Sequence, residues 1–585
     1  MMMNDLRLIC APFAQLYLPS YDTAVLKKTL QLAGISVEID MLYLEYAVRL
    51  KGEAYQSLYS SSLGDAIFSW LLFPENRERL LAEYYVSVPV LDGSFGDLIK
   101  TTEQFVEEYI DATWGNASDF KEIVLFHVYT KQLFPALYIG KRIFEKYGRE
   151  IWLSGYHCSG SCGASLQKMF PYIKKVFGCD IEQAVTNEIA GRRSGDNSSK
   201  IPKSSGIPTP DYEDFLKSIS ALPQKFSDAF LEQYWFQIEF NRGCQWNKCS
   251  FCTLNIQYPS FEQRSQEDII ADYQFMQEHY KTTRILVTSR NSNSNWRELV
   301  AALNAKYPGM KGSYDLSFKI ADLLSEDDAR FLNENDVSIL VGVESLSKAC
   351  LAKINKGQTV IESIMVLKYM ERYGVKCFYN LMCGLPFETD ADCDETERVI
   401  DNIVHLPPPF SMERFRLTSG SAIQKKPELF DIKGMGIRKG IEGALIPVNL
   451  HDIYTPFFLD FESIHDKLEQ RVARFNCLVE AWTDKYYAYA RKRIVRPKQH
   501  SLLYMRRNDW VLEIYDARFT EKYQIYTLCG TDRVLYEYCD RVRSIDEIKA
   551  KFAGYSEVDL LEELNNLVNK KLMYKEDASY LSLAV

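Results

Sequence analysis

The sequence predicts an α/β protein with three folded units: an N-terminal doubly wound, Rossmann-like domain, a partial (β/α)6 barrel, and a C-terminal winged-helix-like α+β domain. Three observations predict this fold class. A chain of 585 residues is too long for one ordinary core. Short apolar strands alternate with helical stretches up to about residue 425. A stretch rich in Ser, Gly and Pro, residues 193–210, separates two series of these repeats.

The first unit, residues 1–195, repeats a strand–helix–strand pattern. Strands are expected at residues 6–10, 37–41, 122–126 and 150–153, with helices at 23–33 and 135–147. This alternation predicts a parallel sheet whose ligands lie beyond the carboxyl ends of the strands. Residues 196–230 are predicted to be a linker, because the stretch at its start has little to bury.

The second unit, residues 231–425, contains six further strand–helix repeats. The strands are expected at residues 235–241, 284–288, 314–320, 338–343, 376–382 and 414–417. Repeats of this length predict an incomplete parallel barrel, in which the chemistry belongs at the carboxyl ends of the strands.

After this barrel the repeating pattern weakens. Residues 426–509 are predicted to be a helical connecting region, and residues 510–585 a compact unit that begins with a strand at 510–516. The element order that follows is typical of a winged helix. Acidic residues slightly outnumber basic ones from residue 540 onward, which favours docking of a peptide or a domain over binding of DNA.

The composition excludes some function classes. A net charge of -10 disfavours nucleic acid as a partner, since phosphate binding requires clustered Lys and Arg. The N-terminal residues lack the features of a signal peptide, and no segment is apolar enough to cross a membrane. We therefore expect a cytoplasmic protein without a membrane partner.

Three cysteines, Cys244, Cys249 and Cys252, stand close together directly after a predicted strand, in NRGCQWNKCSFCTLN. In a cytosolic chain, clustered cysteines favour metal binding over disulfides. Three thiolates can hold a [4Fe-4S] cluster and leave one iron open for the amino and carboxylate groups of S-adenosylmethionine (SAM). With an external electron donor, such a cluster cleaves SAM to a 5′-deoxyadenosyl radical. The alternative, a zinc knuckle, needs a fourth ligand, and the first candidate after Cys252 is His279.

Several longer segments make the likeness to a known family specific. They are APFAQLYLPSYDTAVLK, NRGCQWNKCSFCTLN, GVESLSKACLAKINKGQT, NLMCGLPFET, HLPPP and YLSLAV. The chain resembles the radical SAM family that matures ribosomally synthesised peptides, of the type called RiPP maturation radical SAM protein 1. The resemblance extends over nearly the whole chain. Four residues separate the first two cysteines, whereas three is the commonest radical SAM spacing.

The resemblance implies which residues line the SAM site. They are Gly342, Glu344 and Ser345 after the fourth barrel strand, and Gly384 and Pro386 after the fifth. Arg416 on the sixth strand could reach the same cavity, and Phe251, just before the last cysteine, could lie against the adenine. The residue types alone leave other roles open. The glycines also fit close packing at strand ends, Glu344 fits a helix cap, and Phe251 fits a core position. No catalytic acid or base is identified.

The resemblance also implies a cobalamin-binding type of N-terminal domain. Thr130 and the loop that contains Gly155, Gly160 and Gly163 occupy the places expected for the corrin or its nucleotide tail. No D-x-H-x-x-G stretch is present, so cobalamin would bind without a lower axial histidine from the protein. Tyr156 stands where related sequences have a second glycine.

The expected activity is cobalamin-dependent C-methylation of an unactivated carbon in a precursor peptide. Without cobalamin, the same radical would epimerise, crosslink or oxidise a peptide residue. A third hypothesis is a non-catalytic peptide-binding protein with a structural cluster. It is favoured by the segment around Arg290 and Asn291, where the family's aspartate is replaced.

Overall fold

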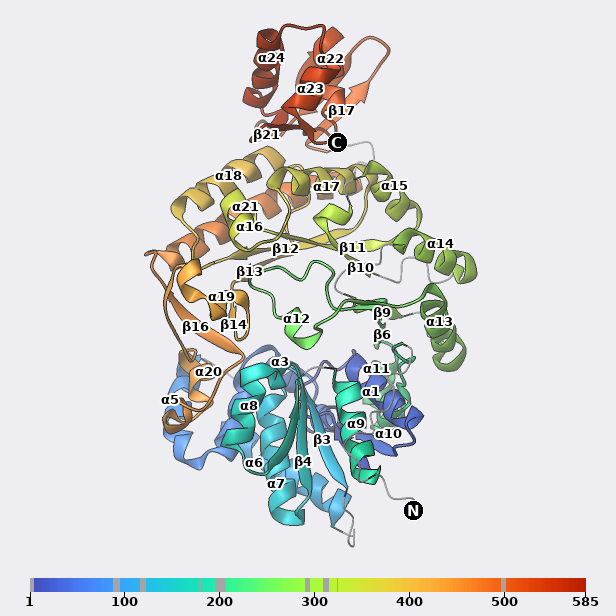
Figure 1. The fold of residues 1–585 in the computed structure, drawn as a ribbon, viewed down its shortest axis with the longest axis vertical. Coiled ribbons are helices and arrows are strands. Elements are labelled where there is room, and N and C mark those ends of the chain that lie inside the picture. Colours follow the sequence, from blue (N-terminus) through green and yellow to red (C-terminus); the bar gives the residue numbers. More distant parts are fainter. Residues whose placement is uncertain are drawn as a thin grey trace.

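The computed structural model describes residues 5–87, 95–115, 122–178, 180–194, 206–282, 284–289, 295–308, 315–323, 325–495 and 501–585. The N-terminal domain lies at one end of the molecule, the barrel in the middle and the C-terminal unit at the other end (Figure 1). Arg290 and Asn291 lie outside the described residues. The α/β fold class predicted from the sequence is confirmed.

The N-terminal domain is built on five parallel strands: β1 (Leu6–Ile9), β2 (Val37–Asp40), β3 (Ile123–Val128), β4 (Glu150–Gly155) and β5 (Ile173–Phe177). Their order is β2-β1-β3-β4-β5, a doubly wound arrangement. Leu8, Leu125 and Leu153 are fully buried, so the centre of the sheet is also the centre of the core. The ligand crevice of such a sheet lies beyond its carboxyl edge.

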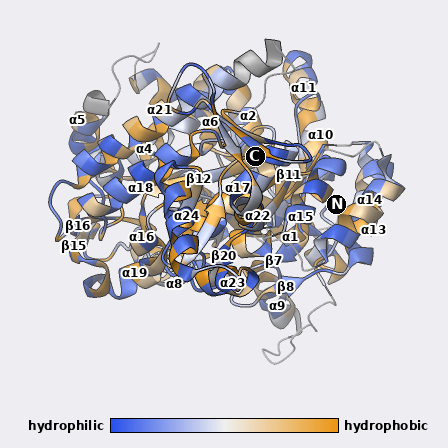
Figure 2. Cartoon of the chain, turned by 90° about the horizontal axis from the view of Figure 1, so that it is seen from above, coloured by the Kyte–Doolittle hydropathy of each residue, from blue (hydrophilic) through white to orange (hydrophobic). Residues whose placement is uncertain are grey.

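Helices cover both faces of this sheet (Figure 1). α1 (Tyr21–Leu32) packs with α9 (Ile181–Ser194), and α7 (Leu133–Tyr147) packs with α4 (Leu63–Leu72) and α6 (Phe95–Trp114). Local signals explain where they start and stop. Ser20 caps α1 by accepting a hydrogen bond from the backbone N–H of Thr23, and Gly148 ends α7 in a left-handed conformation. Figure 2 shows both hydrophilic and hydrophobic residues on the helices, as expected for amphipathic helices that cover a core.

The barrel consists of six short parallel strands in two groups. β6 (Phe236–Ile238) pairs with β9 (Ile285–Val287), and a four-stranded sheet follows in the order β10 (Asp315–Lys319), β11 (Ser338–Glu344), β12 (Cys377–Cys383), β13 (Ser411–Arg414). The register sets Lys319 beside Gly342 and Cys383 beside Arg414. The carboxyl ends of β10 to β13 therefore lie along one edge.

Helices on the outside of the barrel begin at well-defined caps. α15 (Glu326–Glu334), α17 (Val360–Tyr373) and α18 (Asp390–Ile403) each start with a capping box, in which the N-cap hydroxyl and an acidic side chain three residues later exchange hydrogen bonds with the backbone. α13 (Gln266–Tyr280) and α14 (Trp296–Lys306) complete this layer (Figure 1).

Three expectations from the sequence need correction. The sixth strand ends at Arg414, because Leu417 instead belongs to β14 (Leu417–Thr418), which pairs antiparallel with β16 (Phe458–Ser463). The expected linker 196–230 contains α10 (Glu213–Ala221) and α11 (Gln224–Leu231) within its described part. The region 426–509 is not purely helical: besides α21 (Leu468–Val495) it holds β15 (Ile432–Gly436), β16 and β17 (Leu503–Arg507).

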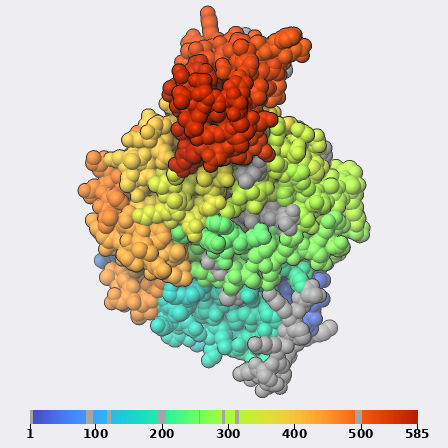
Figure 3. All heavy atoms as spheres, turned by 45° about the horizontal axis from the view of Figure 1, so that its top comes forward, coloured from blue at the N-terminus to red at the C-terminus, as the bar shows by residue number. Residues whose placement is uncertain are grey.

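The C-terminal unit combines two small antiparallel sheets with three helices. β17, β18 (Leu512–Asp516) and β19 (Gln524–Leu528) form the first sheet. Then α22 (Gly530–Tyr538), β20 (Arg543–Ser544), α23 (Ile545–Lys551), α24 (Glu557–Asn569), β21 (Met573–Glu576) and β22 (Ser579–Ser582) follow in the order of a winged helix. The unit projects from the barrel (Figure 3). The buried Lys368 of α17 anchors it, 3.1 Å from Asp540 Oδ1 and 2.9 Å from the carbonyl oxygen of Ser582.

Candidate functional site

The loop with the three cysteines follows the short strand β7 (Asn241–Arg242) and leads into α12 (Leu254–Gln257). Cys244, Cys249 and Cys252 are all half-buried. Gly243 has a φ of 81°, and a Cβ there would lie 2.5 Å from the carbonyl oxygen of Ser260. Only glycine fits this entry to the loop without moving the backbone.

The segment between α16 (Lys348–Lys353) and α17 holds the cysteine loop in place. The backbone N–H of Ser250 donates to the carbonyl oxygen of Ile354 at 2.9 Å. Trp246 Nε1 donates to the carbonyl oxygen of Asn355, also at 2.9 Å. Gly357, with a φ of 69°, lies so close that a Cβ would come within 2.2 Å of the Trp246 ring. The shape of this loop thus depends on a segment 100 residues later in the chain.

Burial disfavours the thiolate form of two of these cysteines. Burial raises the pKa of Cys249 to about 11 and also raises the pKa of Cys252, while Lys356 opposes both shifts. As free thiols they stay protonated, and nearby metal charge is what makes such groups thiolates. No three Cys, His, Asp or Glu side chains in the described ranges converge as ligands of a single metal ion. A [4Fe-4S] cluster does not require this, because each thiolate binds a different iron.

An ion pair between the buried Lys356 and the half-buried Glu344 lies at the carboxyl end of β11, beside the thiols. Lys356 Nζ is 2.7 Å from Glu344 Oε1. The register of β11 shifts between Val341 and Glu344, and Glu344 has a φ of 66°. A bulge of this kind re-aims a side chain, and a strained backbone of this kind is typical of functional sites. A Cβ on Gly342 would lie 2.5 Å from Lys356 Nζ, so a side chain there would displace the ammonium group.

The neighbouring residues add further polar groups. Gln358 Nε2 donates to the carbonyl oxygens of Gly342 and Val343, at 2.8 and 3.1 Å. Lys319, at the end of β10, stacks its ammonium 3.4 Å from the centre of the Trp246 ring. Burial lowers the pKa of Lys319. Two lysines therefore face the cysteine loop, a suitable setting for an anionic ligand such as a carboxylate.

The structure gives the other residues implied by the resemblance different surroundings. Ser345 is buried after β11 and its hydroxyl accepts a hydrogen bond from the backbone N–H of Ser347. Gly384, with a φ of 75°, faces α21, since a Cβ would lie 3.0 Å from Val472. The carbonyl oxygen of Pro386 accepts from the Ser463 hydroxyl. Arg416 is exposed, with its guanidinium 5.6 Å from the Phe458 ring, and Phe251 is half-buried against the core.

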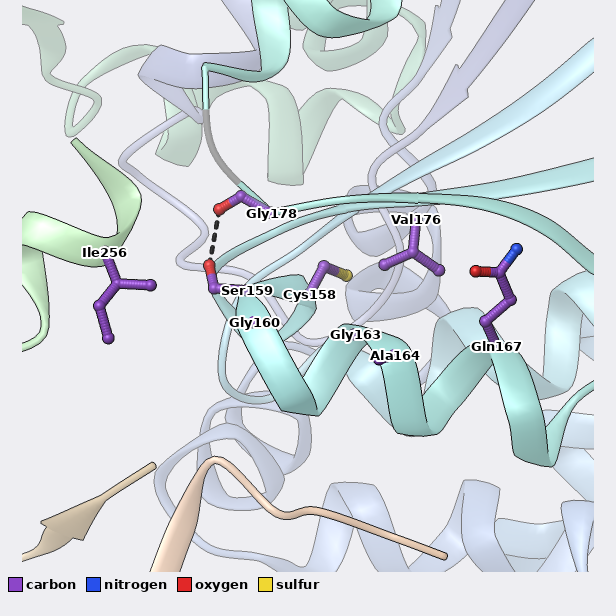
Figure 4. A pocket seen from close by; sticks show the side chains of 9 residues that line it. All are labelled: Cys158, Ser159, Gly160, Gly163, Ala164, Gln167, Val176, Gly178 and Ile256. Atoms are coloured by element: carbon purple, nitrogen blue, oxygen red, sulfur yellow. Dashed lines mark hydrogen bonds between the residues drawn. The ribbon is translucent and has the colours of Figure 1, made fainter. Parts of the chain in front are cut away.

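A second concave site lies at the carboxyl edge of the N-terminal sheet. A cavity of about 310 Å³ opens between α8 (Gly160–Met169), the end of β5 and α12. It is lined by Cys158, Ser159, Gly160, Gly163, Ala164, Gln167, Val176, Gly178 and Ile256. Figure 4 shows Ile256 across from the start of α8. Since α12 follows Cys252 almost directly, the cavity lies between the N-terminal sheet and the cysteine loop.

Glycines shape this cavity. A Cβ on Gly163 would lie 2.0 Å from the carbonyl oxygen of Cys158, and one on Gly178 would lie 2.6 Å from the Cα of Ser159. Gly155, with a φ of 108°, lets β4 approach Val128 of β3. Gly160 has open space around it. The structure therefore brings Gly160 and Gly163 into the cavity wall. Gly155 instead allows close packing of two strands, and Thr130 is exposed on the loop between β3 and α7.

His157 lies beside this cavity but not in its lining. Its ring stacks on Phe457 at 5.1 Å, and within the described chain Nε2 is buried without a hydrogen-bond partner. Burial lowers the pKa of His157 from 6.5 to about 4. His127 also lies outside the lining. Its Nδ1 lies 3.1 Å from the Ser154 hydroxyl.

This environment predicts a pH-dependent stability. Between pH 6.5 and about 4 the unfolded chain protonates His157 and the folded protein does not. The contribution of neutral His157 to the free energy of unfolding is therefore fully present above pH 6.5. It decreases by up to about 3 kcal/mol as the pH falls to about 4. We expect the free energy of unfolding, measured by urea denaturation, to decrease less between pH 7 and pH 4 in His157→Phe than in the wild type. Equal decreases would contradict this assignment.

Comparisons with known proteins agree with the first of these sites. Residues 238–400 match the Radical SAM superfamily. This match covers the cysteine loop and β9 to β12. Residues 238–400 form a radical SAM domain. This domain supports the expectation that the protein is an enzyme. Over 159 residues the chain is 25% identical to an uncharacterized methyltransferase of Pyrococcus horikoshii; the match covers 27% of this chain and 34% of that protein, about a third of its length.

Solved structures share the wider fold of this chain. One is OxsB, a cobalamin-dependent SAM radical enzyme with aqua-cobalamin and SAM bound, with a TM-score of 0.56, 10% identity, and coverage of 84% of this chain and 71% of that one. Another is TsrM from Kitasatospora setae, a radical SAM methyltransferase with cobalamin and a [4Fe-4S] cluster bound, with a TM-score of 0.53, 12% identity, and coverage of 82% and 91%. Identities this low show likeness of fold alone.

Sequence reasoning missed two polar residues that lie near the cysteine loop. Lys356 and Gln358 stand in the quoted segment GVESLSKACLAKINKGQT, but no periodicity links a loop lysine to the end of a strand 12 residues earlier. Gly357 between them was a usable signal, since a glycine amid charged residues marks a tight backbone approach.

Among the described residues, no helix has the length and apolar character needed to cross a bilayer.

Proposed function

We propose that this protein is a cobalamin-dependent radical SAM methyltransferase that methylates an unactivated carbon of a ribosomally synthesised precursor peptide. The observation that carries the proposal is the cavity between the two domains. Its walls come from the N-terminal sheet edge and from Ile256, four residues beyond Cys252. A corrin tail in this cavity would be held by the start of α8 and by Ile256.

The chain's own residues divide the tasks. Cys244, Cys249 and Cys252 would hold the [4Fe-4S] cluster, which reductively cleaves SAM when an external donor supplies the electron. Lys356 and Lys319 would offset the SAM carboxylate. Cobalamin, when bound, would supply a methyl carrier. Since His127 and His157 do not line the cavity, we expect the corrin to bind without a protein axial histidine.

One edge of the first sheet in the C-terminal unit favours a peptide as the substrate. On the outer side of β17, the backbone of Val585 exchanges hydrogen bonds with Leu503 and Met505. β19, at the opposite side of this sheet, pairs with no strand other than β18 among the described residues. Ile525 on β19 is 54% exposed. An extended peptide can add to such an open edge through backbone hydrogen bonds.

The test uses the full-length protein, reconstituted anaerobically with iron, sulfide and cobalamin. It is given SAM with a trideuterated methyl group, a reductant and the precursor peptide encoded beside its gene. We expect a bound corrin in the visible spectrum, 5′-deoxyadenosine, and a peptide that gains one trideuterated methyl group. Peptide epimerisation, crosslinking or oxidation without methyl gain would reject methyl transfer. Absence of 5′-deoxyadenosine would reject the radical SAM activity.

A further inference from the structure

The wing hairpin of the C-terminal unit contacts α17 of the radical SAM domain, and one of these contacts lies at the first turn of the helix. β21 and β22 form this hairpin, and Glu576 stands at the end of β21. Its Oε2 accepts a hydrogen bond of 2.6 Å from the backbone N–H of Ile361, in the first turn of α17. Glu576 is only 9% exposed. A carboxylate at the positive end of a helix, held in a buried contact, fixes where that helix begins.

The start of α17 is joined directly to the SAM site. Three residues before Ile361, Gln358 donates to the backbone at the end of β11, and two residues before that Lys356 pairs with Glu344. Asn355 accepts the Trp246 indole N–H from the cysteine loop. A shift in the first turn of α17 would therefore move the groups that border both the SAM site and the cysteines.

We propose that Glu576 is a positioning residue for SAM binding. By fixing the first turn of α17, it holds Gln358 and Lys356 at the carboxyl end of β11. This inference rests on the proposed function, because SAM is the ligand of the site that it positions. It assigns the winged-helix unit a role in the active site through the contact between Glu576 and Ile361.

Glu576→Ala tests the proposal in the full-length, cluster-reconstituted protein. We expect the SAM Kd, measured by anaerobic calorimetry, to rise by at least about fivefold, within the usual range of coupling between sites. In the protein without SAM, hydrogen exchange of residues 356–363 should become faster. Glu576→Gln keeps an acceptor oxygen for the Ile361 N–H, so its SAM Kd should return to within about twofold of the wild type.

Two controls separate positioning from general damage. Asp577→Ala removes only the exposed pair of the next residue with Lys348, at 2.5 Å, and should leave the SAM Kd unchanged. Leu564→Ala opens the core of α24, where Leu564 is fully buried, and should lower thermal stability without weakening SAM binding. An unchanged SAM Kd in Glu576→Ala, or an equal loss in Leu564→Ala, would overturn the inference. A wild-type protein that binds no SAM would overturn the proposed function itself.

Discussion

Cys252→Ala is expected to lose the iron-sulfur cluster and all SAM cleavage. A cluster on two thiolates lacks one of the ligands that the loop provides, and the thiols at Cys244 and Cys249 cannot replace it. The rate of 5′-deoxyadenosine formation should fall by at least about 10⁶-fold, to the uncatalysed level. Iron content, the visible absorption of the reconstituted protein and 5′-deoxyadenosine by mass spectrometry measure this result.

Cys477→Ala is the matched control, because Cys477 is an exposed thiol on α21, outside the loop. It should retain the cluster and full SAM cleavage. Circular dichroism should show that both variants are folded. If Cys252→Ala kept its iron and its SAM cleavage, the cysteines would not be the cluster ligands and the central assignment would fail.

Ala164→Phe is expected to weaken corrin binding while leaving SAM cleavage nearly unchanged. Ala164 lies on an exposed side of α8 and lines the cavity of about 310 Å³, so a phenyl ring there fills space that a corrin tail needs. Corrin binding, followed by visible spectroscopy, should weaken by at least about a hundredfold, the cost of losing about 3 kcal/mol of contacts. Uncoupled SAM cleavage should stay within about threefold of the wild type, since the cysteine loop is untouched.

Lys168→Phe provides the control for adding an aromatic ring to the same helix. Lys168 is also exposed on α8 but does not line the cavity. It should bind corrin as the wild type does. Equal corrin affinity in Ala164→Phe and the wild type would place cobalamin elsewhere or exclude it, and would favour radical chemistry on the peptide without methyl transfer.

Features encoded by local pattern could be predicted from the sequence. The apolar runs predicted most strands of the two parallel sheets, because buried parallel strands are short and continuous. β5 was not predicted, because only Ile173 of its IKKVF sequence is buried. The clustering of the three cysteines predicted a radical SAM loop, and residues 238–400 match the Radical SAM superfamily. The sixth strand was misplaced because Phe415 and Leu417 continue the apolar pattern while the chain turns into a different sheet.

Features made by contacts between distant segments could not be predicted. Lys356 reaches Glu344 because a bulge in β11 turns the carboxylate, and nothing in the residue pattern shows that bulge. The cavity needs α8 and α12 to face each other, although they belong to different domains. β17 and β19 were missed because their exposed faces carry mixed residues that do not alternate cleanly.

The contact between Gly357 and Trp246 has an evolutionary consequence. The ring leaves no room for a Cβ at position 357, and the φ of 69° disfavours any other residue there. A lineage can therefore lose this glycine only if the tryptophan is lost as well. Among homologues, positions 246 and 357 should covary, with a smaller residue at 246 wherever 357 has a side chain. Their joint change would mark subfamilies in which the cysteine loop has adopted another shape.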